Sequence, residues 1–571
     1  MTPSDPTPVT LGTAPEPALT PVQEGRLFLL LAIFIGIISG LLVVCFRIAI
    51  EWLSLLLLGA QRSPHHLRII FIPAAAGLVI ALLTRFVFPE VRGSGVNQTK
   101  AALYIHNGYI SVRTVTGKFL LSALAIGSGH SLGPEDPSLQ IGAGVASLLS
   151  RRLGLSRQRL RLFAPVGAAA GLAAAFNAPI SAILFVIEEV IGQWSAGILG
   201  SIVLAAVSSV VVARWFWGTE PMFRIPSISL RDPRELLAYA VMGIIGGAAS
   251  LLFSSALGWL RPRLRRQSVN WQTLQPALAG LLVGGIGYFG LPQVMGAGYG
   301  AIDQAMHAQF ALRMLLLLAG FKIIATTLSF SSGTPGGMFA PTLFIGAMLG
   351  ASVGTVEHLI FPHLGVTIGA YALVGMGVLF AAFLRAPLTS VFMVLEVSGN
   401  YSVILPVILA NTIAYLIARS LQPVPIFELL THQDGLDLPS MEEQREEIDL
   451  RIEDAIQPVT VPVLDGAQPL PGEMPLEATA ILIRCSDGGT YAATLGELRT
   501  LAASNPDAPS LALETLLPPE RIPVLFPDQP LVNALPYFSR WPMLTIANRA
   551  QRGLIEGLLT QKSALDRFHR Q

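Results

Sequence analysis

The chain has 571 residues, of which 52% are hydrophobic and 13% are charged, and its mean hydropathy is +0.61. About a quarter of the residues of a soluble protein are charged, so this composition excludes an ordinary soluble protein and indicates a membrane protein. The 37 Lys and Arg residues nearly equal the 36 Asp and Glu residues, which excludes the strong basic field expected of a nucleic-acid-binding protein.

The N-terminal segment 1–22 is rich in proline and threonine and lacks the basic start of a signal peptide, so it is predicted to be a disordered tail. The sequence contains two cysteines, Cys45 in an apolar stretch and Cys485 in a polar one. They indicate neither a disulfide framework nor a thiolate metal site. We therefore expect no bound metal and no cofactor.

Long apolar stretches of spanning or near-spanning length follow this tail. They are 27–60, 69–88, 200–217, 236–259 and 402–420. Other apolar segments are short and begin or end in Gly and Pro, which predicts helices that stop partway through the bilayer around a buried site. These segments are 117–128, 135–150, 338–353 and 386–398. The predicted fold is a polytopic α-helical membrane protein with tilted and discontinuous helices.

The apolar region repeats one pattern in its two halves. Gly133–Ala143 and Gly337–Ala347 share G-x-x-x-P-x-x-x-I-G-A at an offset of 204 residues. Further pairs match at nearly the same offset: Lys118 with Lys322, 93–95 with 296–298, 166–167 with 374–375, and Glu188 with Glu396. We place the first membrane repeat at 23–217 and the second at 233–435. A repeated membrane region predicts a transporter or channel whose binding site lies between the repeats.

The composition changes after about Leu421. Residues 440–571 carry a charge run at 442–447, alternating apolar stretches and many prolines, which predicts a soluble α/β domain. Strand-then-helix patterns appear at 491–498 and 553–565. The densest basic connection, 261–266, is expected to face the cytoplasm by the positive-inside rule.

Four separate motifs occur in a characteristic order. They are G-S-G at 93–95, G-x-E-x-P at 133–137, N-A-P-x-x-x-x-L-F-x-x-E-E at 177–189 and G-G-x-F-x-P at 336–341. Together they make the chain resemble the CLC family of chloride channels and transporters. The resemblance covers 25–435 well and the remainder loosely, where a degenerate pair of CBS domains is indicated.

The resemblance implies a homodimer in which each subunit has its own anion pathway between two inverted repeats. It also implies a multi-pass protein, which we place in a bacterial-type inner membrane, with 440–571 in the cytoplasm. CBS domains that bind adenine nucleotides have a Thr or Ser followed three residues later by an Asp. Here Glu497 and Ser563 occupy the Asp positions. We expect packing or dimer contact there, with nucleotide binding as the alternative.

Gly-rich turns that open short helices can hold an anion. Their exposed N–H groups and the positive helix end attract an anion without a full positive charge, so the ion can leave again. Ser94 would add a hydroxyl, and Met338 and Phe339 would add main-chain N–H groups. Ser94 can also cap the helix that follows it. The resemblance implies chloride for a serine at this position, although Val96-Asn97 replaces the Ile-Pro usual in the family.

Glu135 is an acid at the mouth of a short membrane helix, which makes it a functional hypothesis by default. Its counterpart in the second half is Phe339, so the repeated scaffold does not require an acid there. An ionised Glu135 would mimic the anion, and a protonated one would withdraw, so we predict that it is both gate and proton carrier. A structural acid paired with Lys118 is the alternative.

The neighbours of this glutamate depart from the family. The family usually has G-R-E-G-P or G-K-E-G-P, whereas this chain has Gly133-Pro134-Glu135-Asp136-Pro137. An ionised Asp136 beside Glu135 would raise the pKa of Glu135, so gating is predicted to occur at higher pH. The alternative is that Asp136 caps a helix beginning at Pro137.

Two more positions bear on proton coupling. The resemblance implies that Glu189 relays protons from the cytoplasm, while Glu188 is shared by both halves and is expected to be structural. A solvated surface acid is the alternative for Glu189. The family usually places a Tyr hydroxyl near the anion at the start of the last membrane helix, and Phe427 stands there without the hydroxyl. This loss predicts weaker chloride binding and looser coupling.

We therefore predict a protein that is not an enzyme and that exchanges chloride for protons across the membrane. A passive chloride channel, gated by voltage or pH, is the alternative within transport. From other classes, 127–131 would suggest an intramembrane serine hydrolase, although a Ser and a His within one short loop rarely reach hydrogen-bond geometry. A membrane anchor for 440–571 would leave the repeated buried motifs unexplained.

Overall fold

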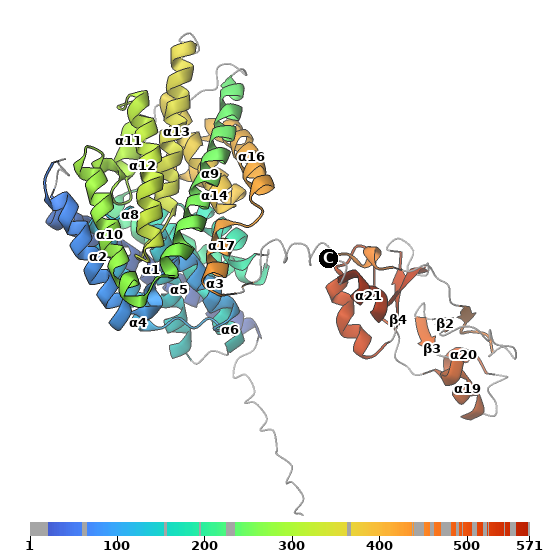
Figure 1. The fold of residues 1–571 in the computed structure, drawn as a ribbon. Coiled ribbons are helices and arrows are strands. Elements are labelled where there is room, and N and C mark those ends of the chain that lie inside the picture. The colour runs from blue at the N-terminus through green and yellow to red at the C-terminus, as the bar shows by residue number, and fades with distance from the viewer. Residues whose placement is uncertain are drawn as a thin grey trace, which may run out of the picture. The chain divides into compact units, whose positions relative to one another are not determined.

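The computed structural model describes 21–59, 65–153, 157–192, 196–223, 235–361, 367–436 and 438, and 450–568 with internal gaps. The predicted tail therefore lies outside the described residues, except at its last two positions. The chain divides into two compact units, Met1–Pro439 and Ser440–Gln571, which are described separately below (Figure 1).

The first half of the Met1–Pro439 unit is helical. Its elements are α1 (Pro21–Leu58), α2 (Arg68–Phe86), η1 (Pro89–Val91), α3 (Gly95–Tyr104), α4 (Val112–Gly127), α5 (Glu135–Arg152), α6 (Arg157–Phe176), α7 (Pro179–Phe185), η2 (Val186–Ile191) and α8 (Ala196–Trp217). Pro179 begins α7 at the first helical position, where a missing N–H costs nothing. The next segment, η2, is a π-helical turn.

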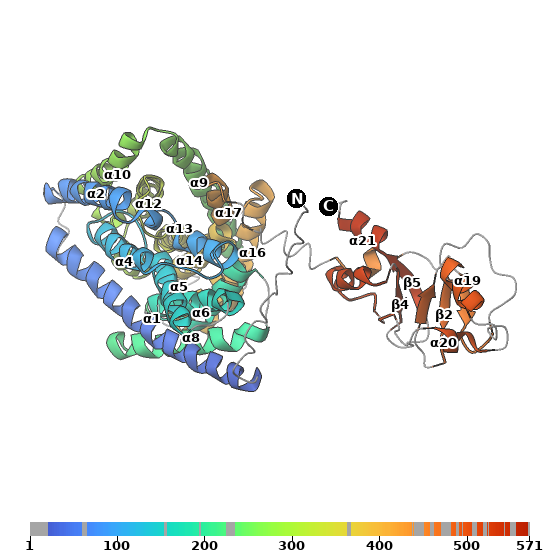
Figure 2. The ribbon, with the colours of Figure 1, turned by 90° about the horizontal axis from the view of Figure 1, so that it is seen from below.

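The second half repeats this order. Its elements are α9 (Glu235–Arg265), α10 (Val269–Tyr288), η3 (Pro292–Val294), α11 (Tyr299–Met306), α12 (Leu312–Ser331), α13 (Phe339–Ile360), α14 (Ile368–Leu384), α15 (Pro387–Ser398), η5 (Tyr401–Val403), α16 (Ile404–Leu421) and α17 (Ile426–Gln433). Figure 2 shows α13 and α14 inside the unit, with α1, α2 and α9 around them.

Seven helices among the described residues are long and apolar enough to cross a membrane. The five long stretches expected from the sequence are among them. Two others were not expected as spans. Leu312–Ser331 contains Arg313 and Lys322, which interrupt its apolar pattern, and α13 has 22 residues because its apolar run continues past 353. Helix α13 is therefore longer than the segment 338–353 that the sequence indicated.

The sequence repeat is also a repeat of helix packing. A Cβ atom on Gly142 of α5 would lie 2.1 Å from the carbonyl oxygen of Gly167 in α6. A Cβ atom on the equivalent Gly346 of α13 would lie 2.2 Å from the carbonyl oxygen of Gly375 in α14. Small residues let helix backbones approach closely in a membrane protein, where packing rather than the hydrophobic effect joins helices. The two halves therefore share one glycine-dependent helix crossing.

The paired lysines hold the loops that precede α3 and α11. The Lys118 ammonium donates to the carbonyl oxygens of Val91 at 3.3 Å and Gly93 at 2.8 Å. Lys322 donates to Val294 at 2.9 Å and Gly296 at 2.7 Å. Both side chains are fully buried, and a buried ammonium requires such partners.

Glu188 and Glu396 have matching structural roles. Glu188 accepts hydrogen bonds from the main-chain N–H groups of Leu388 at 3.2 Å and Thr389 at 2.9 Å, at the start of α15. Glu396 accepts from Ile180 at 2.9 Å and Ser181 at 2.8 Å, at the start of α7. Each half thus supplies the acid that stabilises a helix N-terminus of the other half. This reciprocity is the relation expected of two halves around a pseudo-two-fold axis.

The Ser440–Gln571 unit contains strands and helices, as the sequence predicted. Three strands form one sheet in the order β1 (Val463–Asp465), β2 (Ile481–Arg484) and β3 (Thr490–Ala493), with β1 parallel and β3 antiparallel to β2. An antiparallel pair follows, β4 (Met543–Ala547) and β5 (Ile555–Thr560). The helical elements are η6 (Ile452–Asp454), α19 (Leu495–Ser504), α20 (Leu513–Leu516), η7 (Leu531–Ser539) and α21 (Gln561–Phe568). Helices α19 and α21 follow β3 and β5 directly.

Candidate functional site at the meeting point of the two halves

The two halves are joined by a backbone contact at the centre of the repeated motif. Gly133 N–H donates to the Gly337 carbonyl at 2.8 Å, and Gly337 N–H donates to the Gly133 carbonyl at 2.8 Å. A Cβ atom on Gly337 would lie 2.5 Å from Cβ of Asp136, so this approach requires glycine. Helices α5 and α13 begin two residues after these glycines. Their positive N-terminal ends are therefore brought together.

Glu135 reaches across this contact to the other half. Its side chain is fully buried, and its Oε2 accepts a hydrogen bond from the Ala340 N–H, in the first turn of α13, at 3.4 Å. The Tyr299 hydroxyl, at the first residue of α11, donates to Oε1. The carboxylate thus lies on a helix N-terminus, where an anion would also bind. Lys118, the cation considered as its structural partner, donates to loop carbonyls instead.

Tyr299 was not identified from the sequence. It directly follows 296–298, which had been recognised as the repeat of 93–95, and it begins a helix. Gly298 before it has a φ of 88°, a left-handed conformation that glycine adopts without strain. Tyr299 could therefore have been found from the sequence as an aromatic residue with a hydroxyl that directly follows a repeated glycine turn.

Ser94 and Asp136 form a second polar cluster at the start of α3. Ser94 Oγ accepts from the Val96 N–H at 3.2 Å, which confirms its role as helix cap. The same hydroxyl donates to Asp136 Oδ2 at 2.9 Å, and Val96 N–H also donates to Asp136 Oδ1 at 2.9 Å. Asp136 therefore caps α3. The alternative that Asp136 caps a helix beginning at Pro137 is contradicted, because α5 begins at Glu135, before Asp136.

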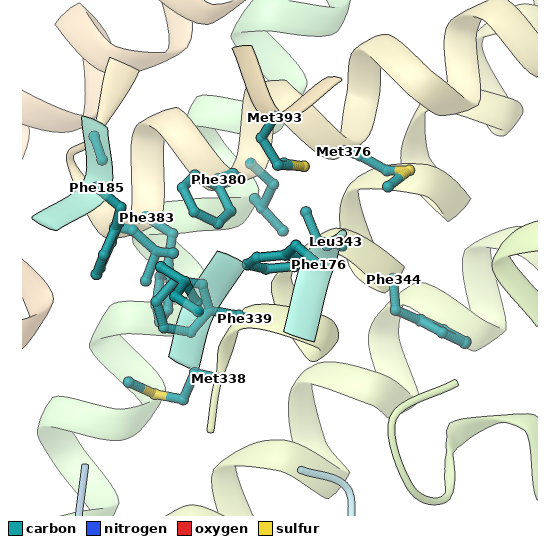
Figure 3. Close-up of a cluster of buried hydrophobic side chains, with 14 of the residues drawn as sticks. Phe176, Phe185, Met338, Phe339, Leu343, Phe344, Met376, Phe380, Phe383 and Met393 are labelled. Carbon is teal, nitrogen blue, oxygen red and sulfur yellow. The ribbon is translucent and has the colours of Figure 1, made fainter. Parts of the chain in front are cut away.

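An aromatic cluster surrounds the start of α13. The Phe339 ring lies 4.9 Å from the Phe185 ring, 5.6 Å from Phe380 and 6.0 Å from Phe176, measured between centroids (Figure 3). Met338 precedes it and is also fully buried. The main-chain contacts of Met338 and Phe339 with an anion stay a prediction, as does the anion contact of Ser94.

Phe427 belongs to the same cluster. Its ring centroid lies 6.3 Å from that of Phe339 and 6.4 Å from that of Phe185, and 1% of its surface is exposed. Asn97 Nδ2 donates to the Phe427 carbonyl at 2.9 Å, which joins the start of α17 to α3. The last helix therefore begins beside the first turn of α3. Contact of Phe427 with an anion stays a prediction.

Glu189 is buried and charge-paired. It lies in the π-helical turn η2, a type of turn that is frequent at functional sites, and 4% of its surface is exposed. Its Oε1 pairs with the ammonium of Lys100 from α3. This burial contradicts the alternative of a solvated surface acid. Lys100 was missed, because 89 residues separate it from Glu189 and nothing local relates them.

Cavities approach this region from opposite ends of α4. A cavity of about 690 Å³ is lined by Ile126 in the last turn of α4, together with Pro134 and Tyr299. Another, of about 560 Å³, is lined by Thr114 in the first turn of α4 and by Ser94. Glu135 and Asp136 have no exposed surface, but Tyr299, which donates to Glu135, lines the first cavity and Ser94, which donates to Asp136, lines the second. The acidic pair therefore lies in the closed part of the protein between these cavities.

The structure gives no support to hydrolase chemistry at 127–131. His130 Nε2 lies 3.1 Å from the Pro73 carbonyl, Ser128 Oγ donates to the Ala125 carbonyl at 3.0 Å, and Ser131 Oγ lies 2.9 Å from Thr326 Oγ1. The hydroxyls of Ser128 and Ser131 thus bond to groups other than the His130 imidazole. Within the described part of the chain, no group of three or more His, Cys, Asp or Glu side chains could hold a metal ion.

These features define a polytopic helical membrane protein of two related halves that meet at a buried carboxylate. A family model described as voltage gated chloride channel matches residues 76–419. The chain belongs to this family, the CLC family.

Curated relatives and solved structures agree with this assignment. The chain is 33% identical over 418 residues to the H(+)/Cl(-) exchange transporter ClcA of Salmonella paratyphi B, covering 70% of this chain and 87% of that protein. It is 33% identical over 404 residues to a protein of Ralstonia nicotianae named putative chloride channel protein ClcB-like, covering 69% of this chain and 94% of that protein. A slow cyanobacterial Cl-/H+ antiporter matches with a TM-score of 0.65 and 25% identity, covering 73% of this chain and 99% of that one. A eukaryotic CLC transporter matches in fold, with a TM-score of 0.62 and 19% identity, covering 95% of this chain and 98% of that one.

Proposed function

We propose that this protein exchanges chloride for protons across a membrane, through one pathway in each subunit. The observation that carries the proposal is the position of Glu135, a buried carboxylate bound to the Ala340 N–H between two cavities. The similarity to an H(+)/Cl(-) exchange transporter and to a Cl-/H+ antiporter supports chloride and protons as the two ions.

The proposed mechanism uses one site for two anions in turn. While Glu135 is ionised, its carboxylate occupies the N-terminus of α13 and excludes chloride. When it gains a proton, the neutral group has less attraction for the helix end, and chloride takes the Ala340 N–H in its place. The proton leaves on the side from which Glu135 next becomes accessible. Tyr299 holds the ionised carboxylate in position by its hydrogen bond.

Glu189 is the proposed inner proton relay, and Ser94, Met338, Phe339 and Phe427 are the proposed chloride contacts. The burial of Glu189 in a π-helical turn supports a role beyond solvation. Its ion pair with Lys100 favours the charged carboxylate, so each proton transfer through Glu189 must work against that pair.

We further propose a homodimer, with membrane repeats at 23–217 and 233–435 and a cytoplasmic CBS-like pair at 440–571 in a bacterial-type inner membrane. Exposed apolar side chains on α8 and α16, such as Val211 and Leu405, support contact with lipid or with a second subunit. The basic connection 261–266 supports the cytoplasmic assignment. Packing is the role proposed for the CBS-like pair, and adenine nucleotide binding is the alternative.

A passive chloride channel is the second candidate, and one observation favours it. Phe427 lies beside Phe339 but cannot donate a hydrogen bond to chloride. A weaker central site would let chloride pass without a matched proton.

The first test is transport by the purified protein in liposomes. With a chloride gradient and no proton gradient, we expect chloride efflux to drive protons inward, and we expect the chloride rate to rise as the pH falls. A pH electrode and a chloride electrode record both ions together. Chloride flux without proton movement would establish the channel instead, and the absence of chloride flux would reject both candidates.

A second test restores the missing hydroxyl. Phe427→Tyr adds one donor for a desolvated anion, and such a hydrogen bond contributes about 1.5–3 kcal/mol. We expect chloride to bind about ten-fold more tightly in calorimetry, since each 1.4 kcal/mol is about ten-fold, and to carry more protons per chloride in liposomes. The control is Phe380→Tyr, in the same cluster on α14. Unchanged binding in Phe427→Tyr would show that position 427 packs away from the pathway.

A further inference from the structure

The start of α3 is occupied by a carboxylate of the protein itself. Asp136 accepts from the Ser94 hydroxyl and from the Val96 N–H, both at 2.9 Å. A hydroxyl and a helix N-terminal amide are the donors that would bind a chloride ion. Asp136 is fully buried, and 3% of Ser94 is exposed, so no water shell separates these groups.

One cation and one acid face Asp136. Lys118 is the cation that faces it, and its ammonium holds the Gly93 carbonyl of the Ser94 loop at 2.8 Å. Glu135 is the acid that faces it from the same turn of α5. Lys118 therefore attracts a negative charge at the start of α3 and Glu135 repels it, while a second negative charge would also meet repulsion from the Asp136 carboxylate.

The second half shows that the helix does not need this cap. By the repeat, Ala297 is equivalent to Ser94 and Ala340 to Asp136. The equivalent helix α11 begins at Tyr299 without a side-chain cap. The hydroxyl and the acid thus occur together in one half and are both alanine in the other, which indicates a shared role other than folding.

We propose that Asp136 is a tethered competitor for chloride at the Ser94 position. Chloride enters the site only when the Asp136 carboxylate leaves the Ser94 hydroxyl and the Val96 N–H. The apparent affinity for chloride is then the intrinsic affinity multiplied by the small fraction of molecules in which Asp136 has left. This role is distinct from that of Glu135, which occupies the start of α13. The inference rests on the proposed chloride contact of Ser94.

The test compares chloride binding in Asp136→Gly and Asp136→Asn by calorimetry on the full-length protein. Asp136→Gly removes the competitor, and we expect chloride to bind at least about ten-fold more tightly than in the unaltered protein. Asp136→Asn keeps the shape and removes the charge, so an intermediate gain is expected. If the glycine variant does not fold, chloride binding by the asparagine variant tests the proposal. The double variant Asp136→Gly with Ser94→Ala should lose most of the gain in chloride affinity, because it lacks the hydroxyl that chloride would use.

A purely structural cap gives the opposite result. In that case both Asp136 variants would melt at lower temperature and bind chloride no more tightly, which would overturn the inference. The liposome assay of the unaltered protein shows whether the competitor role alone fails or the proposed transport function fails too. If that protein moves chloride and Asp136 variants show no gain in affinity, the competitor role alone is rejected. If it moves no chloride, the transport proposal fails as well.

Discussion

Replacing Glu135 by glutamine is expected to leave chloride flux running at a rate that no longer depends on pH, and to abolish proton movement. The glutamine side chain copies the protonated glutamate in size and charge, so it has no carboxylate to compete with chloride at the Ala340 N–H. It also has no group that binds and releases a proton at physiological pH. Liposome flux recorded with pH and chloride electrodes measures both effects.

Glu51→Gln is the matched control for this variant. Glu51 lines the same cavity as Tyr299 but is exposed, and it pairs with Arg47 on its own helix at 3.5 Å. Exposed pairs of this kind contribute little, so its transport should match that of the unaltered protein. Flux in Glu135→Gln that still followed pH would mean that another group is the gate.

Replacing Glu189 by glutamine should abolish proton transport and leave much of the chloride flux. The anion route at the helix ends and the inner entry of the proton need not coincide, and glutamine cannot relay a proton. The change also leaves Lys100 buried without its partner, and breaking a buried pair costs about 3–5 kcal/mol. We therefore expect a lower melting temperature for this variant, measured in detergent.

The double variant Lys100→Met with Glu189→Gln separates transport from stability. It removes both buried charges, so its melting temperature should recover while proton transport stays absent. Glu188→Gln serves as the structural control, because Glu188 holds the start of α15. It should lower stability and reduce both fluxes together. Loss of chloride and proton flux in equal measure in the double variant would contradict the relay role of Glu189.

Much of this protein was predictable because its signals are local or repeated. Composition and apolar length identified a membrane protein, since a bilayer requires long apolar helices. The comparison of the two halves identified Glu135 as an acid whose counterpart, Phe339, is apolar, and Glu188 as a residue with an equivalent in Glu396. The reciprocal caps of Glu188 and Glu396 agree with that interpretation.

Contacts between distant segments were decided by the tertiary structure alone. The sequence determined which acids lie in apolar surroundings, but not which groups face them. Tyr299 meets Glu135 across 164 residues, and Lys100 meets Glu189 across 89. Asp136 had a local explanation as a cap of its own helix, yet it bonds to the Ser94 loop 42 residues earlier. A buried polar group takes whichever partner the packed helices place within reach, because leaving it unpaired is costly, and only the fold determines that partner.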